Sequence, residues 1–93
     1  MIISFGSKVT KKVWEGEIVI SFSIDLQRIA RRKLRMLNSS QSITDLLIPP
    51  SNRLEKLKGD LKGYYSIRIN DQWRIIFIWN NGNASEVEIV DYH

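Results

Sequence analysis

Apolar and polar residues alternate most regularly over residues 64–79, where β-branched and aromatic side chains predominate. Tyr65, Ile67 and Ile69 fall on one side of the first half of this stretch. Four apolar residues share one side of the second half: Trp73, Ile75, Phe77 and Trp79. A period of two with this composition predicts two β-strands joined by a tight turn.

The same pattern predicts the register of this hairpin. Both apolar sets face one side only if the turn holds an odd number of residues, because a slip of one residue moves every side chain to the other face. We therefore expect residues 70–72 to form the turn. That register places Arg68 and Arg74 side by side on the face away from the core. Adjacent cations repel, which suggests a polyanion or a carboxylate nearby, but two solvated charges are the simpler interpretation.

Helical spacing occurs in the first half of the chain. Ser7 is suited to cap a helix over residues 8–14, and Asp25 to cap a second helix over residues 26–37. The buried stripe of the second helix, with the stem of Lys33 at its edge, is expected to be Leu26, Ile29, Ala30, Lys33, Leu34 and Leu37. The rest of its surface carries Arg28, Arg31, Arg32 and Arg35. This basic side predicts either a solvated helix surface or a contact with RNA or an acidic partner.

The remaining segments are short. We expect a first strand at residues 2–5, a loop or mobile arm at 18–22, a single helical turn at 42–47, and a stiff, exposed connection at 49–52. Residues 53–57 predict extended chain, with Leu54 and Leu57 pointing inward. The run Asn80-Asn81-Gly82-Asn83 predicts a second hairpin turn, because Asn-Gly tolerates positive φ. The last strand is expected over residues 85–90, with Val87 and Ile89 inward and Glu86 and Glu88 outward beside Arg68 and Arg74.

These elements predict one α+β domain over residues 1–93, an antiparallel β-sheet meander with two N-terminal helices packed on one face. The composition, 43% hydrophobic and 26% charged, is that of an ordinary globular protein. The absence of cysteine excludes disulfides and is compatible with the cytoplasm, where we expect the protein. We expect no signal peptide and no membrane span. The net charge of +4 favours an acidic or phosphate-bearing partner.

The candidate chemistry lies in the second half of the chain. One histidine and scattered carboxylates predict no metal site, and we expect no cofactor. The meander can gather five groups at one edge of the sheet: Lys58, Arg74, Asp91, Tyr92 and His93. RNA cleavage by 2′-hydroxyl attack needs cations to stabilise negative charge on the phosphoryl oxygens, and groups that move protons, each worth roughly 10²–10⁴-fold. Tyr92 could stack on a base. None of this spacing is diagnostic by itself.

A resemblance adds weight to this hypothesis. The segments Leu57-Lys58-Gly59-Asp60, Gly63-Tyr64, Ser66-Ile67-Arg68, Trp73-Arg74-Ile75 and Asp91-Tyr92-His93 resemble the HigB family of host-inhibition toxins, within the larger RelE/ParE-like group. The runs at residues 52–57 and 70–74 match a subset of that family closely. The resemblance covers nearly the whole chain and is weakest over residues 16–23. It implies a RelE-like microbial RNase toxin fold.

The resemblance also implies a mechanism and partners. HigB-like toxins enter the ribosomal A site and cut translated mRNA without a metal, by attack of the 2′-oxygen. Carried over, Lys58 and Arg74 would stabilise the phosphate, Asp91 and His93 would move protons or orient the substrate, and Tyr92 would position a base. Some members have a histidine shortly before the lysine, where this chain has Glu55-Lys56-Leu57, which leaves His93 as the sole imidazole. The expected RNA- or ribosome-binding cations are Arg28, Arg31, Arg32, Arg35, Lys62 and Arg68.

The family partner is a small helix-turn-helix antitoxin of the HigA type, and only the complex with this antitoxin would bind operator DNA. Two alternatives remain. A ParE-like toxin shares the fold but acts on DNA gyrase, and it would not need Lys58, Arg74 and the terminal residues together. A non-catalytic basic module would bind RNA or protein through the arginines of the second helix.

Overall fold

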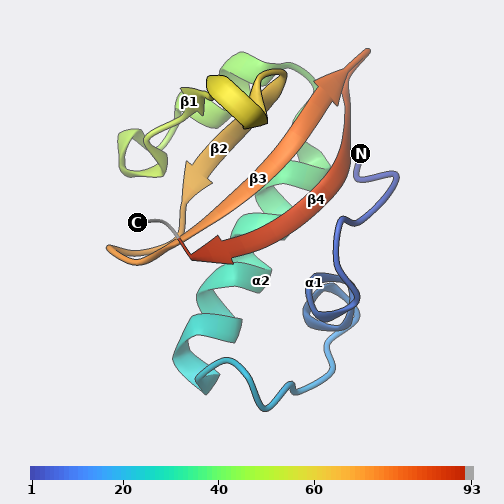
Figure 1. The fold of residues 1–93 in the computed structure, drawn as a ribbon, viewed down its shortest axis with the longest axis vertical. Helices are drawn as coiled ribbons and strands as arrows, with labels where there is room; N and C mark the ends of the chain where they lie inside the picture. The colour runs from blue at the N-terminus through green and yellow to red at the C-terminus, as the bar shows by residue number, and fades with distance from the viewer. Residues whose placement is uncertain (92–93) are drawn as a thin grey trace.

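The computed structural model describes residues 1–91, which form two helices and a four-stranded antiparallel sheet (Figure 1). Helix α1 spans Lys8–Trp14 and α2 spans Ile24–Ser39. The strands are β1 (Glu55–Lys56), β2 (Tyr64–Arg68), β3 (Trp73–Asn80) and β4 (Asn83–Asp91), and they lie in that order in the sheet. Short 3₁₀ helices η1 (Ile43–Leu47), η2 (Pro50–Asn52) and η3 (Gly59–Leu61) join them. Helix α2 lies behind the sheet, whose other face, the open face, carries no helix longer than η3 (Figure 1). The predicted α+β meander is confirmed.

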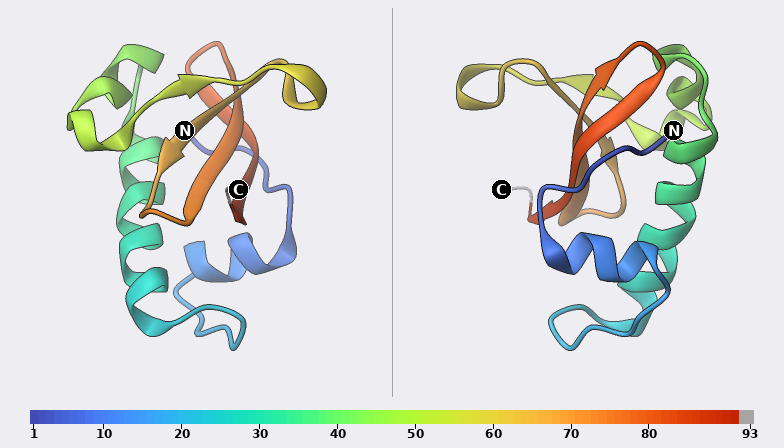
Figure 2. Two further views of the ribbon diagram at one scale, coloured as in Figure 1. Left: turned by 60° about the vertical axis from the view of Figure 1, so that its left-hand side comes forward. Right: turned by 90° about the vertical axis from the view of Figure 1, so that its right-hand side faces the viewer.

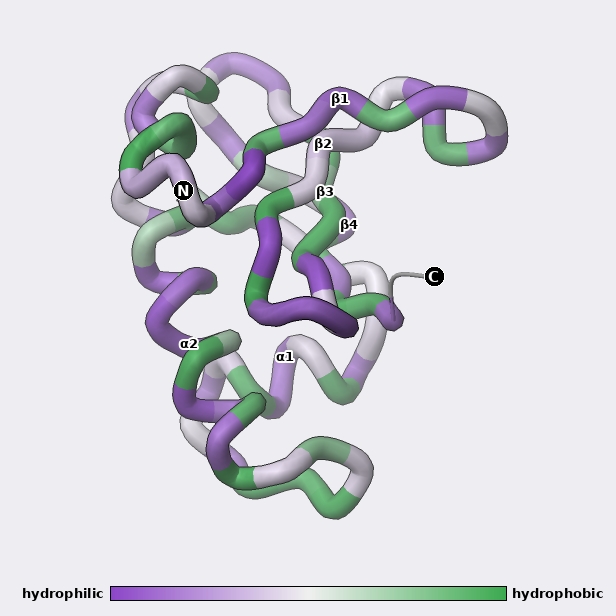
Figure 3. Tube along the Cα trace, turned by 90° about the vertical axis from the view of Figure 1, so that its left-hand side faces the viewer, coloured by the Kyte–Doolittle hydropathy of each residue, from purple (hydrophilic) through white to green (hydrophobic). Residues whose placement is uncertain are grey.

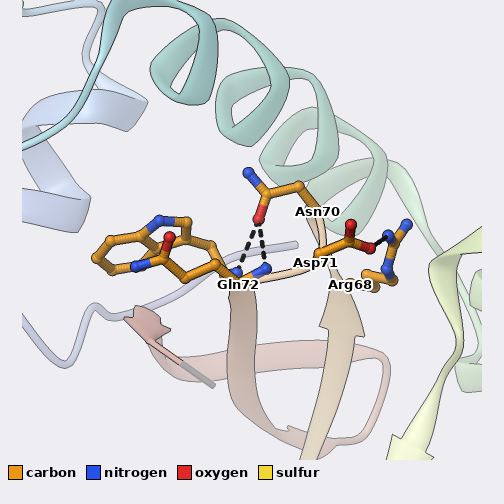
Figure 4. A network of polar contacts seen from close by, with 5 residues as sticks. Arg68, Asn70, Asp71 and Gln72 are labelled. Atoms are coloured by element: carbon orange, nitrogen blue, oxygen red, sulfur yellow. Dashed lines mark hydrogen bonds and ion pairs between the residues drawn. The ribbon is translucent and has the colours of Figure 1, made fainter. Parts of the chain in front are cut away.

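The central hairpin has the predicted register. Arg68 pairs with Arg74 across β2 and β3, and the Ile69 N–H donates to the Trp73 carbonyl at 2.9 Å. The side-chain oxygen of Asn70 accepts from the backbone N–H groups of Gln72 and Trp73 at 2.9 and 2.8 Å, which fixes the turn (Figure 4). The turn therefore holds residues 70–72, as the parity of the apolar positions requires.

The second hairpin turn is also as predicted. Asn81 and Gly82 have φ of 52° and 79°, the positive values of a type I′ turn. Strand β4 begins at Asn83, two residues earlier than expected. A register shift between Ile76 and Ile78 marks a bulge, and Glu86 has a φ of 51°. The extra residue allows Ala84 and Val87, three positions apart, both to be buried.

The core lies between α2 and the inner face of the sheet. The α2 stripe buries Leu26, Ala30, Leu34 and Leu37 against side chains that include Ile67, Ile75, Phe77, Val87 and Ile89. Ile29 packs partly buried against this cluster. The predicted inward positions of Val87 and Ile89 are confirmed. Neither helix of residues 1–91 is long and apolar enough to cross a membrane.

The start of α2 differs from the prediction. Ser23, not Asp25, is the N-cap, and its hydroxyl oxygen accepts from the Leu26 N–H at 3.1 Å. Serine caps as well as aspartate, so the helix begins two residues earlier. Asp25 instead lies in the first turn and pairs with Arg28 at 3.2 Å, where a negative charge suits the helix dipole.

The N-terminal segment is not a regular strand. Ile2 and Phe5 form isolated parallel bridges with Ala84 and Val87, and the segment runs beside β4 (Figure 2). The bulge at Glu86 lies between these two bridges and interrupts a continuous ladder. The segment still covers the outer edge of β4, which would otherwise expose unpaired backbone groups.

The connection at residues 49–52 is not wholly exposed, because Asn52 is fully buried. Its side-chain amide donates to the Leu46 carbonyl at 3.1 Å, and its side-chain oxygen accepts from the Lys33 ammonium at 2.5 Å. Lys33 is therefore buried, not at the edge of the stripe. Burial lowers the pKa of Lys33 below its ordinary value, and the charges of Arg32 and Arg68 lower this pKa further.

Residues 18–22 form a loop, as expected, and Gln27 of α2 holds this loop. The Gln27 side chain donates to the carbonyls of Val19 and Phe22 at 2.8 Å each and accepts from the Val19 N–H at 3.1 Å. Val19 is buried between two exposed isoleucines, Ile18 and Ile20. The loop forms an apolar end of the molecule (Figure 3).

Candidate functional site

The open face of the sheet carries two neighbouring hollows. The first, about 600 Å³ and here called the Lys58 cleft, is lined by Leu57, Lys58, Leu61, Ile76, Glu88, Val90 and Asp91. The second, about 300 Å³ and here called the arginine hollow, is lined by Arg53, Glu55, Arg68, Asn70, Asp71 and Arg74. The two hollows adjoin, because Arg74 of one lies directly opposite Val90 of the other in the β3–β4 ladder.

Lys58 reaches its cleft from the turn after β1. The Leu57 N–H donates to the Tyr64 carbonyl at 2.8 Å, which ties the chain to β2 just before Lys58. Gly59 then adopts a φ of 67°, a value that favours glycine, and starts η3. The expectation that both Leu54 and Leu57 point inward is wrong for Leu57. Residues three apart on a strand face opposite sides, so Leu54 packs on the core and Leu57 lines the cleft.

Asp91 closes the other side of the same cleft. It is the last residue of β4 and pairs with Trp73 in the ladder. Its carboxylate accepts from the side-chain amide of Gln72 at 3.1 Å. Sequence reasoning missed this contact, which depends on the turn at residues 70–72 lying beside the end of β4. Tyr92 and His93, predicted to act with Asp91, lie outside the described residues.

Arg74 is the most buried cation of the site, with 5% of its surface exposed. Its guanidinium donates to the Arg53 carbonyl at 2.6 Å and lies 3.5 Å from the Glu55 carboxylate. Arg53 has a φ of 45°, in the left-handed region. The interpretation of two solvated charges is therefore wrong for Arg74, because the chain before β1 surrounds it.

Arg68 differs from its cross-strand neighbour. Its side chain is 31% exposed and forms an ion pair with the fully exposed Asp71 on the turn (Figure 4). A carboxylate was predicted near the two arginines, and the structure has one beside each: Asp71 beside Arg68 and Glu55 beside Arg74. Sequence reasoning named neither, because Glu55 comes from a strand that is distant in sequence and Asp71 was assigned only to the turn.

The other predicted RNA-binding arginines belong to α2, which lies on the opposite face of the sheet from the open face (Figure 1). Arg28 pairs with Asp25, and the Arg31 side chain donates to the Val13 carbonyl at 2.9 Å near the end of α1. Arg32 and Arg35 are exposed. Of the other predicted RNA-binding cations, Lys62 lines a small hollow next to Lys58, and Arg68 lines the arginine hollow.

The open face therefore brings together an ammonium and a carboxylate in one cleft and three guanidinium groups beside it. Such a surface can hold a polyanion and place a proton-transfer group next to it. Glu88 adds a second carboxylate to the Lys58 cleft. Within residues 1–91, no group of three or more side chains of the metal-binding types lies together.

Comparison with known proteins gives a family. Residues 4–93 match a family described as the RelE-like toxin of type II toxin-antitoxin system HigB. The chain is 55% identical over 53 residues to Toxin HigB-1 of Vibrio cholerae serotype O1, a match that covers 57% of this chain and 56% of that protein. It is 36% identical over 98 aligned positions to Endoribonuclease HigB of Proteus vulgaris, with both chains covered completely. The chain thus spans little more than half of the first relative and all of the second.

Solved structures share the fold. The chain is similar to the YoeB-YefM complex from Staphylococcus aureus, with a TM-score of 0.63 and 19% identity over 100% of this chain and 98% of that one. It is also similar to the YoeB dimer from the same species, with a TM-score of 0.61 and 20% identity over 99% and 94% of the two chains. At these identities the likeness establishes the architecture.

Proposed function

Because this chain belongs to the HigB family of RelE-like toxins of type II toxin-antitoxin systems, we propose that it is a ribosome-dependent endoribonuclease that cuts translated mRNA in the A site. A relative of similar length is named an endoribonuclease, which supports the activity. The observation that carries the proposal is that Lys58 and Asp91 line one cleft next to the hollow that contains Arg74.

The proposed reaction needs no metal. The 2′-oxygen loses its proton and bonds to the adjacent phosphorus, while the bond from phosphorus to the 5′-oxygen breaks and that oxygen gains a proton. The products are a 2′,3′-cyclic phosphate and a 5′-hydroxyl. Lys58 and Arg74 stabilise the charge that develops on the phosphoryl oxygens, and a cation fixed in place beforehand does this at little reorganisation cost. Arg74 is such a cation, because the Arg53 carbonyl and the Glu55 carboxylate hold it.

The proton-transfer groups are Asp91 and His93, and Tyr92 positions a base. Asp91 lies at the edge of the Lys58 cleft with its carboxylate bound by Gln72. The roles of Tyr92 and His93 rest on the resemblance of the closing Asp91-Tyr92-His93 to the family pattern.

We propose two surfaces of contact with the translating ribosome, which would place the protein in the cytoplasm. Lys62 and Arg68 lie beside the cleft and would contact the mRNA. The exposed arginines of α2 would contact ribosomal RNA phosphates on the opposite side of the molecule. The partner that restrains the toxin is a helix-turn-helix antitoxin of the HigA type, and operator DNA binding belongs to that complex.

The test is cleavage in a translation extract by three variants, Lys58→Ala, Arg74→Ala and Asp91→Asn. Loss of a charge-stabilising cation or a proton-transfer group should lower the cleavage rate by roughly 10²–10⁴-fold. Lys12→Ala and Glu15→Gln remove exposed charges of the α1 region and serve as matched controls that should cut normally. Circular dichroism checks that each variant is folded. Folded Lys58 and Asp91 variants that cut at the parental rate would contradict the assignment.

A further inference from the structure

The arginine hollow has features of a binding site of its own. Three arginines line it, Arg53, Arg68 and Arg74, together with two acidic residues, Glu55 and Asp71. The lining therefore has one positive charge in excess. Among residues 1–91, every residue that lines it is charged or is an asparagine. Its chemistry suits a single phosphate group of a nucleic-acid backbone.

Part of this site is fixed. Arg74 is buried, and its guanidinium donates to the Arg53 carbonyl at 2.6 Å, so the chain before β1 holds it in place. Arg53, which provides this carbonyl, has a left-handed backbone and is itself one of the residues that line the hollow. A fixed cation binds an anion without losing side-chain entropy at that moment.

The other part is exchangeable. Asp71 is fully exposed, and an ion pair with such a side chain is weak because water competes for both partners. Asn70, not Asp71, accepts the hydrogen bonds that fix the turn, so the Asp71 carboxylate can leave Arg68 while the turn keeps its shape (Figure 4). A phosphodiester carries the same single negative charge as this carboxylate and can take its place on Arg68.

The position of the hollow suggests which phosphate it takes. Arg74 precedes Ile76 by two residues on β3, and Ile76 lines the Lys58 cleft. Two residues of strand span about 6.6–6.8 Å, a length comparable to the spacing of neighbouring phosphates in an extended strand. A strand with one phosphate in the Lys58 cleft would therefore bring the next phosphate to the arginine hollow.

We propose that the arginine hollow binds the phosphodiester next to the one that is cut, with Arg74 at the border of the two hollows between both phosphates, and that Asp71 occupies Arg68 until the RNA displaces it. Arg53 is a new phosphate-binding residue, and Asp71 is an internal competitor that weakens binding of free RNA. The inference rests on the proposed function, because it takes the anion to be RNA and places the phosphodiester that is cut in the Lys58 cleft. A backbone phosphate is the same in every sequence, so this contact should not depend on the base sequence of the RNA.

The test measures binding of a short single-stranded oligodeoxynucleotide, which lacks the attacking 2′-hydroxyl, by fluorescence anisotropy over a series of salt concentrations. Asp71→Asn should bind roughly two- to fivefold more tightly, the range that loss of an exposed competing pair allows. Asp25→Asn is the matched control, since Asp25 forms the same type of exposed pair, three residues from its arginine, on α2. It should leave the affinity unchanged.

A double-mutant cycle tests whether the tighter binding of Asp71→Asn acts through Arg68. In an Arg68→Ala background, Asp71→Asn should bring no gain, because the competitor has lost its target. A gain that persists, an equal gain from Asp25→Asn, or a wild-type protein that fails to bind the oligonucleotide at low salt would each overturn the proposal.

Arg53→Gly tests the new phosphate-binding residue without endangering the fold, since glycine suits a positive φ. This variant should keep the parental melting temperature, bind several-fold more weakly, and show a salt slope shallower by about 0.7. An unchanged slope would remove Arg53 from the site. Cleavage in a translation extract is scored separately. A protein that passes these binding tests but cuts no mRNA refutes the nuclease and leaves the phosphate site intact.

Discussion

Arg68 and Arg74 are cross-strand neighbours on one sheet face, and the same substitution should affect them very differently. We expect Arg74→Lys to destabilise the fold strongly and Arg68→Lys to leave its stability almost unchanged. Arg74 donates to the Arg53 carbonyl at 2.6 Å and lies 3.5 Å from Glu55, with 5% of its surface exposed. A lysine ammonium is a single point of charge and cannot reach two acceptors as a planar guanidinium does.

The magnitude follows from the contacts. A hydrogen bond from a charged donor contributes roughly 1.5–3 kcal/mol, and the bond from Arg74 to the Arg53 carbonyl is of this kind and partly buried. We assign most of this to the Arg53 carbonyl, because the Glu55 carboxylate is 47% exposed and water can replace its partner. A loss of about 1.5–3 kcal/mol should lower the melting temperature by about 6–24 °C for a domain of this length. Arg68→Lys keeps a cation that can pair with the fully exposed Asp71, so its effect should stay within about 0.5 kcal/mol.

The assay is urea unfolding followed by circular dichroism, with thermal unfolding as a second measurement. Glu55→Gln serves as a control that keeps an acceptor near Arg74, and it should cost less than about 1 kcal/mol. Equal free energies of unfolding for the two lysine variants, or a larger loss for Arg68→Lys, would show that the contacts of Arg74 with the Arg53 carbonyl and Glu55 do not stabilise the fold.

Two further predictions concern buried polar groups of α2. Lys33→Met should lower stability at neutral pH by roughly 1–3 kcal/mol, because the fully buried Asn52 loses its donor. Folding lowers the pKa of Lys33 below its ordinary value of 10.5. Between the lowered pKa and 10.5 the unfolded chain therefore binds more protons than the folded protein. The stability of the parental protein rises with pH over this range. Lys33→Met should lack this rise, so the difference in free energy of unfolding between the two proteins should be larger at alkaline than at neutral pH in urea titrations. An equal difference at both pH values would contradict the prediction. Gln27→Ala should speed amide exchange at Val19, whose N–H binds the Gln27 side chain, and leave Ile89 unchanged, whose N–H binds the Thr10 hydroxyl. Equal protection at Val19 in both proteins would refute the role of Gln27.

Local chemistry made much of the fold predictable. The parity of the apolar positions around residues 70–72 determines the hairpin register, and Asn81-Gly82 determines the second turn. Ser7 caps α1 as predicted, with its hydroxyl accepting from the Thr10 N–H at 3.2 Å. These features depend on residues close together in the sequence.

The errors concern contacts between distant segments. Lys33 and Asn52, 19 residues apart in the sequence, are hydrogen-bonded to each other in the interior. Neither residue type by itself predicts burial. Gln27 lies on the buried stripe as a polar residue because the loop after α1 supplies its partners. Serine and aspartate are similar caps, so composition could not separate Ser23 from Asp25 at the start of α2.

The candidate site was predictable to the extent that topology alone determines it. An antiparallel meander brings the entry to one strand and the exit from a later one to the same edge, which is why Lys58 and Asp91 line one cleft. The burial of Arg74 was not predictable, since its acceptors come from the irregular chain at Arg53 and from the two-residue strand β1. The roles of all these residues in catalysis remain predictions.

The most direct test of the central claim is mapping of mRNA 5′ ends in a reconstituted translation reaction, with and without ribosomes. We predict new 5′-hydroxyl ends inside A-site codons, only while ribosomes translate, and no cut at a codon whose attacking nucleotide carries a 2′-deoxy sugar. Equal cutting of naked RNA, or growth inhibition with no new ends, would contradict the account.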